Sequence, residues 1–173
     1  MKKREKGNWL AHIRLLKYKE DIAPFEKLGK EAEFHKLFKP FEIREIEGNL
    51  LLNEGIDEMW DLVCGTGSPT QFSNANAYIG VGDSSTAAAA AQTGLQAASN
   101  KLYKAMETGY PTTTTQKATF KSSFGDSEAN FAWNEWTVAN GNSDDSKNMN
   151  RKVESLGTKS SGTWTLEVSI TLS

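Results

Sequence analysis

The chain has 173 residues, of which 38% are hydrophobic and 24% charged, and its formal net charge is −2. This length suits one domain, or one domain with an extension, and allows a core of useful size. No apolar run approaches the roughly 20 residues that a transmembrane helix requires, and the single cysteine excludes both an intrachain disulfide and a cysteine metal site.

The first 48 residues are predicted to form an N-terminal arm. Residues 2–19 carry seven basic side chains against one acid, Glu5. Such a segment favours an acidic partner, and a solvated tail is the alternative. Nucleic-acid binding is the weaker interpretation because few aromatic side chains interrupt the basic ones. The opening resembles a signal peptide, but charged residues break the stretch that follows, so we expect no secretion by that route and assembly in a reducing cytoplasm.

Two amphipathic patterns lie within this arm. Apolar residues at spacings of three and four predict a short helix over residues 7–20, and a second pattern follows over residues 25–41. Four phenylalanines in this second stretch are more apolar surface than an isolated peptide buries. We therefore expect the arm, helical or extended, to lay aromatic and apolar side chains into a groove on its own domain or on a neighbouring subunit. The predicted anchors are Trp9, Leu16, Phe25, Phe34, Phe38 and Phe41.

Residues 49–64 form the clearest predicted helix. Apolar residues recur there at helical spacing, acidic residues fill the other faces, and Gly65 is placed to end the helix. Because Gly55 weakens a helix interior by about 1 kcal/mol, the helix could begin later than Asn49. We expect its apolar face to pack on a sheet and Cys64 to be a core residue.

The stretch Asn76–Leu95 joins a charged, helical part of the chain to a polar, β-patterned part. It runs through a β-prone Tyr-Ile-Gly-Val-Gly segment into a run of five alanines, predicted to be a closely packed connector, either a short helix or a loop. Its two glycines lack the Lys and Ser/Thr of a phosphate loop, so a tight turn explains them better. Residues 96–108 are a possible short helix.

From Thr112 onward the hydrophobic period becomes two. Strands are predicted around residues 118–124, 131–138 and 149–156, and the alternation is clearest in the last, over residues 163–172. A change of parity at Asn134-Glu135 indicates a β-bulge or a strand buried on both faces. Several such strands with turns between them predict an antiparallel β-sandwich over residues 49–173, an α+β and mainly β fold.

The sequence offers no convincing catalytic or cofactor site. His12 and His35 lie far along the chain from any plausible nucleophile, so no triad can be assembled, and we expect neither enzymatic activity nor a cofactor. The asparagines and aspartates after Asn140 lack the glycine and glutamate of an EF-hand. A loose surface calcium site stays open as an alternative; it would use Asp126, Glu128, Asp144 and Asp145. Three β-strand tryptophans are expected in the core: Trp133, Trp136 and Trp164.

Four segments carry a resemblance to a known family. They are Tyr78–Leu95 with its Tyr-Ile-Gly-Val-Gly-Asp-Ser-Ser-Thr-Ala-Ala sequence, Asn134-Glu135-Trp136, Met149–Val153, and Trp164–Leu172. Together they resemble small structural proteins of tailed bacteriophages, in which such a glycine-rich stretch precedes a C-terminal β-domain. The resemblance covers roughly residues 49–173 and contains no catalytic motif.

This resemblance implies a virion component that assembles in the host cytoplasm. A capsid cement or decoration protein is the favoured interpretation, with the arm binding the major capsid protein or other virion subunits, and with further copies of the chain as partners. A tail or fibre component is the alternative within the same class. A carbohydrate-binding module with exposed aromatic side chains is the alternative from another class. We expect no membrane partner.

Overall fold

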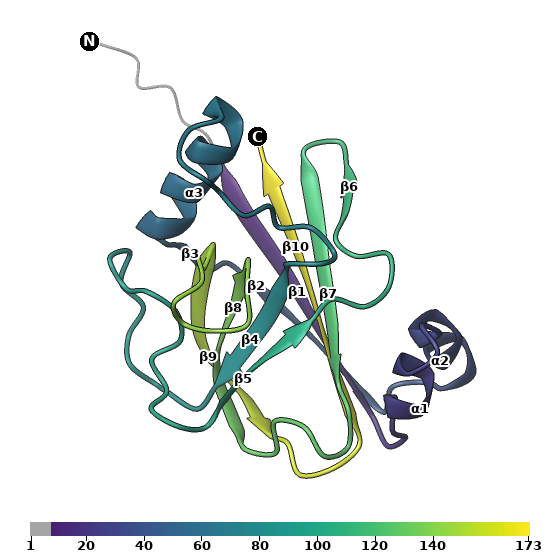
Figure 1. Ribbon diagram of the computed structural model, residues 1–173. Helices are drawn as coiled ribbons and strands as arrows, with labels where there is room; N and C mark the ends of the chain where they lie inside the picture. Colours follow the sequence, from purple (N-terminus) through teal and green to yellow (C-terminus); the bar gives the residue numbers. More distant parts are fainter. Residues whose placement is uncertain (1–7) are drawn as a thin grey trace.

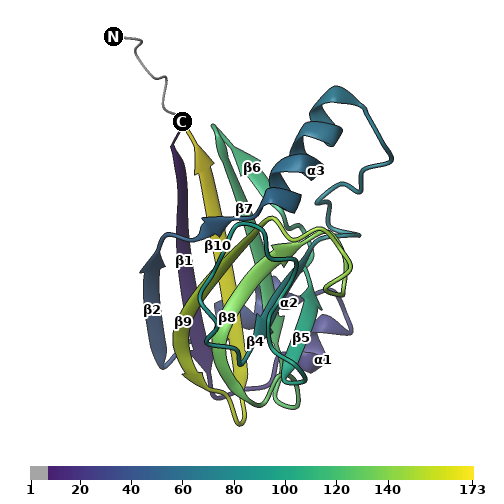
Figure 2. The same ribbon diagram turned by 90° about the vertical axis from the view of Figure 1, so that its left-hand side faces the viewer.

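The computed structural model describes residues 8–173, which form two antiparallel five-stranded sheets packed face to face (Figures 1 and 2). Both chain ends of the described part meet at one end of this sandwich, where Asn8 and Ser173 exchange two backbone hydrogen bonds. The predicted fold class, a mainly β antiparallel sandwich, is confirmed. None of the helices in the described range is long and apolar enough to cross a membrane.

The first sheet places the two ends of the chain side by side. In order across the sheet, its strands are β2 (Glu42–Glu47), β1 (Trp9–Tyr18), β10 (Thr163–Leu172), β7 (Lys117–Phe124) and β6 (Thr112–Thr114). The second sheet is built from the middle of the chain. Its strands, again in order, are β3 (Leu50–Leu51), β9 (Asn150–Thr158), β8 (Ala132–Ala139), β4 (Tyr78–Gly82) and β5 (Lys101–Ala105).

The predictions of a helix over residues 7–20 and of a separate arm over residues 1–48 are wrong for the residues described. Strand β1 lies inside the first sheet, paired along its full length with β10 and over six residues with β2. Ala11, Ile13 and Leu15 alternate along it and are buried in the core. Leu10 and Leu16 lie on the other face of the strand and produced the helical spacing in the sequence. Pairing of β1 with β10 on one side and β2 on the other determines the strand conformation instead. Within residues 8–173, the first strand of the sandwich therefore begins at Trp9.

Three helices complete the fold. The second amphipathic pattern forms two short helices, α1 (Ala23–Glu26) and α2 (Glu31–Leu37), between β1 and β2. Helix α3 (Asn53–Cys64) ends at Gly65, whose φ of 65° is the left-handed conformation that glycine favours, as predicted. Figure 1 shows α3 at one end of the sandwich and α1 with α2 at the other.

The core lies between the sheets and includes Trp133, Trp136 and Trp164, as the sequence predicted. The β-bulge is also confirmed, because the β8–β9 register shifts between Trp133 and Glu135. The short helix considered for residues 96–108 is instead strand β5, at the edge of the second sheet. The alanine run is a loop, since residues 83–100 contain no helix.

Candidate functional site

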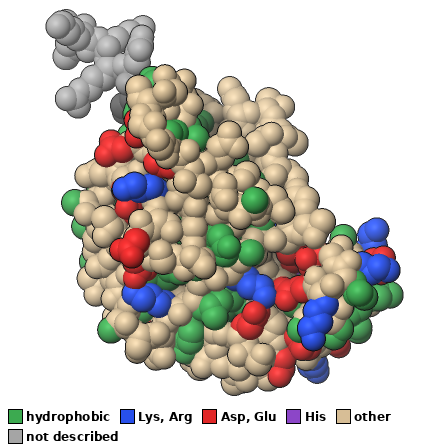
Figure 3. Space-filling model, viewed as in Figure 1, with side chains coloured by type: hydrophobic (Ala, Val, Ile, Leu, Met, Phe, Trp, Pro, Cys, Tyr) green, Lys and Arg blue, Asp and Glu red, His purple; other side chains and the backbone are tan. Residues whose placement is uncertain are grey.

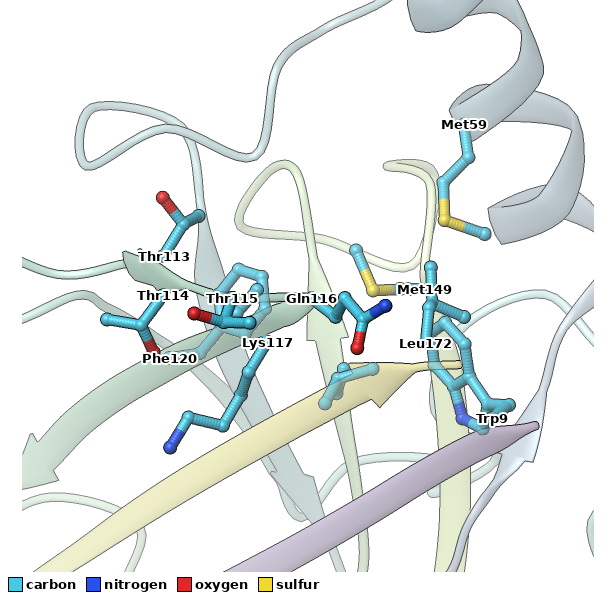
Figure 4. A pocket seen from close by; sticks show the side chains of 12 residues that line it. Trp9, Met59, Thr113, Thr114, Thr115, Gln116, Lys117, Phe120, Met149 and Leu172 are labelled. Carbon is cyan, nitrogen blue, oxygen red and sulfur yellow. The ribbon is translucent and has the colours of Figure 1, made fainter. Parts of the chain in front are cut away.

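A cleft opens at the α3 end of the sandwich, where the two sheets separate. Its cavity volume is about 460 Å³, within the range of ligand pockets. Ala118, Phe120 and Ile170 line it from β7 and β10, while Met149 and Met59 approach from the second sheet and from α3 (Figure 4). Met59 is partly exposed there, whereas Met149 is buried, and a flexible thioether side chain beside an apolar cleft suits contact with another apolar surface.

The rim of the cleft joins the two chain ends. Trp9 at the start of β1 lies opposite Leu172 at the end of β10, and the Trp9 indole nitrogen donates to the Asn49 side-chain oxygen at 2.6 Å. This hydrogen bond holds the indole at the mouth of the cleft. The β6–β7 turn, Thr115 and Gln116, forms the opposite rim, with both residues at positive φ.

Helix α3 is fixed above the cleft by its first two turns. A Cβ added at Gly55 would lie 2.5 Å from the Met149 carbonyl oxygen, so the helix backbone touches the second sheet there. The buried Glu58 carboxylate accepts hydrogen bonds from the Thr70 backbone N–H and the Asn140 amide, both at 2.7 Å. Gly55 and Glu58 therefore define the face of α3 that packs inward.

The apolar face predicted for α3 is only partly buried. Leu52 is fully buried at the start of the helix, but Trp60 exposes 61% and Val63 75% of their surface. Cys64, expected in the core, is exposed as well. The inward positions are occupied by a glycine and a glutamate, so the predicted stripe is rotated toward solvent. The outer face of α3 is consequently an apolar surface beside the cleft.

At the opposite end, α1 and α2 cover a second, smaller core. Phe34 is fully buried there with Tyr18 and Ile22, and the partly buried side chains packed against it are Leu16, Phe25 and Phe38. The rings of Phe34 and Tyr18 meet edge to face, with centroids 5.0 Å apart. The two helices therefore belong to the sandwich and use most of their aromatic residues within it.

A buried polar cluster fastens α2 to the first sheet. The Glu107 carboxylate accepts from His35 Nε2 at 2.8 Å and from the Ser123 hydroxyl at 2.5 Å, and it forms an ion pair with Lys121 at 3.2 Å. Because Nε2 donates to a carboxylate, the neutral ring has its lone pair on Nδ1, which accepts from the Tyr18 hydroxyl at 3.0 Å. Ser123 thus bonds the carboxylate rather than the imidazole, and the cluster lacks the order of a nucleophilic triad.

The ionisation of this cluster follows from its burial and partners. Burial alone would raise the pKa of Glu107, but the hydrogen bond from His35 and the charge of Lys121 outweigh it and leave the pKa below its ordinary value. Burial, followed by the nearby Glu107 charge, raises the pKa of Tyr18 to about 12. The phenol therefore stays protonated and can donate to His35. The hydrogen bonds and the ion pair of this cluster hold α2 against the first sheet.

A buried ion pair joins the second sheet to the loop of residues 83–100. The Glu135 and Arg151 side chains are both fully buried, and Arg151 Nε donates to Glu135 Oε2 at 2.6 Å. The backbone N–H groups of Gln96 and Ala97 also donate to the Glu135 carboxylate, at 3.0 and 2.7 Å. One carboxylate therefore satisfies an arginine and two loop amides at once.

Arg151 completes the attachment from its other nitrogens. Nη1 donates to the Gln92 side-chain oxygen and Nη2 to the Thr86 carbonyl oxygen, both at 2.9 Å. The alanines between these two residues supply no large side chain, so the arginine holds this part of the loop by polar contacts. The closely packed connector that the sequence predicted is thus held in place by the Glu135–Arg151 pair, which lies outside the connector in the sequence.

The six predicted anchors do not form one site. Leu16, Phe25, Phe34 and Phe38 pack at the α1–α2 end within their own chain, and Trp9 lies at the opposite end beside the cleft. Phe41 is the one anchor of the six with a largely exposed side chain, at 58%. Because Phe34 is fully buried within its own chain, it follows the own-domain alternative and cannot anchor a neighbouring subunit. The cleft and the outer face of α3 were missed, since nothing local in the sequence shows which helical stripe faces out.

The loose calcium site considered from the sequence does not form. Glu128 is paired with Lys104 at 2.7 Å, whereas the Asp144 carboxylate, in the loop between β8 and β9, accepts from the Tyr103 hydroxyl at 2.6 Å and pairs with Lys101. The two carboxylates serve separate ion pairs. Within residues 8–173, no group of three or more His, Cys, Asp or Glu residues is arranged to hold a metal ion.

The fold and the cleft together define a two-sheet antiparallel sandwich with an apolar opening at one end. Comparison with protein-family models, with curated proteins and with solved structures gives no match to this chain.

Proposed function

We propose that this chain is a non-enzymatic structural subunit of a tailed-bacteriophage virion, acting as a cement or decoration protein on the capsid. One observation carries the proposal. Three of the segments that resemble phage structural proteins meet at a single point, where Glu135 and Arg151 hold the loop that follows β4. The residues behind the resemblance therefore attach this loop to the second sheet, which suits a family defined by architecture rather than by catalysis.

The contacts of such a subunit come from the two ends of the sandwich. Within residues 8–48, the arm that the sequence suggested is part of the fold, so this segment cannot bridge neighbouring subunits as a flexible strap. The cleft with the outer face of α3, and the exposed apolar side chains around α1 and α2, take its place. Repetition of modest contacts over many copies gives a stable shell through avidity.

Two other functions remain as candidates. A tail or fibre subunit would use the same surfaces in fewer copies. A carbohydrate-binding module would need exposed aromatic rings, and Trp133, Trp136 and Trp164 are buried in the core. Trp60 is the tryptophan with the most exposed side chain among residues 8–173, so it is the ring that a glycan would stack on.

The test is the copy number of this chain in purified particles of the phage that encodes it, by quantitative mass spectrometry against the major capsid protein. A ratio near one to one, or near one per capsomer, is the expected result. A handful of copies per particle would assign the chain to the tail or fibre instead. Its absence from particles would refute the virion proposal, and glycan binding lost in Trp60→Ala would then support the carbohydrate-binding alternative.

A further inference from the structure

The large exposed apolar side chains gather at the two ends of the sandwich. The head surface, at the α3 end, consists of the cleft with Leu10, Trp60, Val63 and Leu172. The tail surface, at the end formed by α1, α2 and the start of β2, consists of Leu28, Leu37, Phe41 and Ile43. Each of these eight side chains exposes at least half of its surface. Two separate apolar surfaces on one small protein indicate two contact sites.

The exposed charges on the outer face of α3 and on the segment 27–41 are opposite in sign. Helix α3 contains no lysine or arginine, and of its four acidic residues Asp57 is exposed while Glu58 is buried. One exposed lysine, Lys117, lies in the lining of the cleft itself. In the segment 27–41 beside the tail surface, four lysines are exposed and Glu33 is the one exposed acid. Figure 3 shows basic and hydrophobic side chains over α1 and α2, with acidic side chains among them. The exposed lysines are Lys27, Lys30, Lys36 and Lys39. A basic apolar surface and an acidic apolar surface are complementary in both respects.

The two surfaces cannot meet within one chain. Strand β1 runs from Trp9 beside the cleft to Tyr18 beside α1, and a ten-residue strand is roughly 30 Å long. Figures 1 and 2 both place α3 and the α1–α2 pair at opposite ends. A surface that complements the head must therefore come from another molecule, and the tail of a second copy provides it.

We propose that copies of this chain associate head to tail, with the tail surface of one copy docked on the head surface and cleft of the next. Phe41 and Leu37 supply apolar side chains for the cleft and the outer face of α3, while Lys36 and Lys39 face the acidic side of α3 at Asp57. The proposal deepens the virion function and rests on it for its biological setting, although the contact itself can be measured on purified protein. Because the two surfaces differ, the contact is heterologous and produces rings or open filaments.

Two charge-reversed variants test the contact. The tail variant carries Lys36→Glu and Lys39→Glu, and neither lysine has an ion-pair partner among residues 8–173. The head variant carries Asp57→Lys and Trp60→Lys, both exposed positions on α3. Lys147→Glu, an exposed lysine in the loop between β8 and β9, is the control for a change of net charge. Circular dichroism and the thermal midpoint establish that each variant is folded.

Sedimentation velocity over a range of protein concentrations, at low and high salt, measures the association. The wild-type chain and Lys147→Glu are expected to form oligomers that grow with concentration and weaken with salt. Each charge-reversed variant alone should associate roughly tenfold or more weakly. An equimolar mixture of the two variants retains one intact head and one intact tail. It should therefore associate more tightly than either variant alone.

Three results would overturn the proposal. They are a wild-type chain that stays monomeric up to about 100 μM, charge-reversed variants that associate as tightly as the wild type, and a mixture that forms no complex. A monomeric chain that is nevertheless abundant in particles would make the capsid protein the occupant of the head surface and leave the virion function standing. Head-to-tail association of a chain absent from particles would instead refute the virion function alone.

Discussion

Arg151 and Glu135 lie 2.6 Å apart, Nε to Oε2, with neither side chain accessible to solvent. Removing two charges from water costs several kcal/mol each, and such a pair is tolerated only where additional hydrogen bonds satisfy both groups. Here the loop of residues 83–100 supplies them. The pair therefore links the stability of the second sheet to the order of that loop.

Replacing Arg151 by methionine should lower the free energy of unfolding by about 3–5 kcal/mol, because it leaves the Glu135 carboxylate buried without its cation. It should also release the loop, so that limited proteolysis cuts within residues 83–100. Urea unfolding at neutral pH measures the first effect. Arg44→Met is the matched control, since Arg44 pairs with Glu154 on the surface at 3.8 Å, and its loss should stay within about 1 kcal/mol. Equal losses in the two variants would contradict this account of the loop.

Gly55→Ala should destabilise the protein, the reverse of the usual effect in a helix. Alanine at an ordinary interior helix position stabilises by about 1 kcal/mol relative to glycine. At Gly55 the new methyl group would lie 2.5 Å from the Met149 carbonyl oxygen, so α3 must move away from the second sheet. Thermal unfolding measures the effect, with Asp57→Ala on the exposed side of α3 as the control. A more stable Gly55→Ala protein would show that α3 is not held against the sheet there.

Glu107 should stabilise the fold at pH values above the ordinary pKa of glutamate, and it should stabilise the fold less at lower pH. Folding lowers its pKa, so the carboxylate stays ionised where the unfolded chain binds a proton, and the stabilisation disappears as the pH falls from about 4.5 through the folded pKa. In Glu107→Gln, we expect the free energy of unfolding to fall by roughly 1–3 kcal/mol at neutral pH. On acidification it should fall further by less than it does in the wild type. Urea unfolding between neutral pH and pH of about 3 measures both.

Glu33→Gln is the control for this pH series, because Glu33 is exposed and pairs only at the surface, with Lys30 at 3.3 Å. It should reproduce the wild-type pH dependence. An unchanged slope in Glu107→Gln would mean that the acid sensitivity of the fold originates in other carboxylates.

Deleting residues 1–45 should abolish folding, because it removes β1 from between β10 and β2 together with most of β2. Amide proton dispersion in a two-dimensional NMR spectrum distinguishes a folded fragment from an unfolded one. A folded 46–173 fragment would restore the arm that the sequence first suggested.

The β-domain could be predicted from the sequence because its strands have a regular period. Strand β10 alternates buried and less buried residues from Leu166 to Thr171, and the bulge in β8 followed from a change of parity. Strand β1 could not be recognised in the same way. Leucines on both of its faces obscure the period of two, and its conformation is decided by β10, about 150 residues further along the chain.

The candidate site was less predictable than the fold. Which side of α3 faces the protein depends on Gly55 and Glu58, a small and an acidic residue that hydrophobic periodicity does not assign to an inward face. The cleft depends on the separation of the two sheets. The tail surface depends on which phenylalanines are buried in the small core and which stay exposed. Phe34 and Phe41 have the same chemistry in the sequence, yet one is buried and the other exposed.

Cross-linking within particles tests most directly whether the subunit assembles through its two ends. Particles are assembled from an equal mixture of ¹⁴N-labelled and ¹⁵N-labelled chains and treated with a carbodiimide, which couples a carboxylate to a lysine in direct contact. The account predicts cross-linked peptides that join Asp57 of one copy to Lys36 or Lys39 of another, with mixed isotope labels in half of them. Efficient cross-links from these lysines exclusively to other virion proteins, with none to α3, would contradict it.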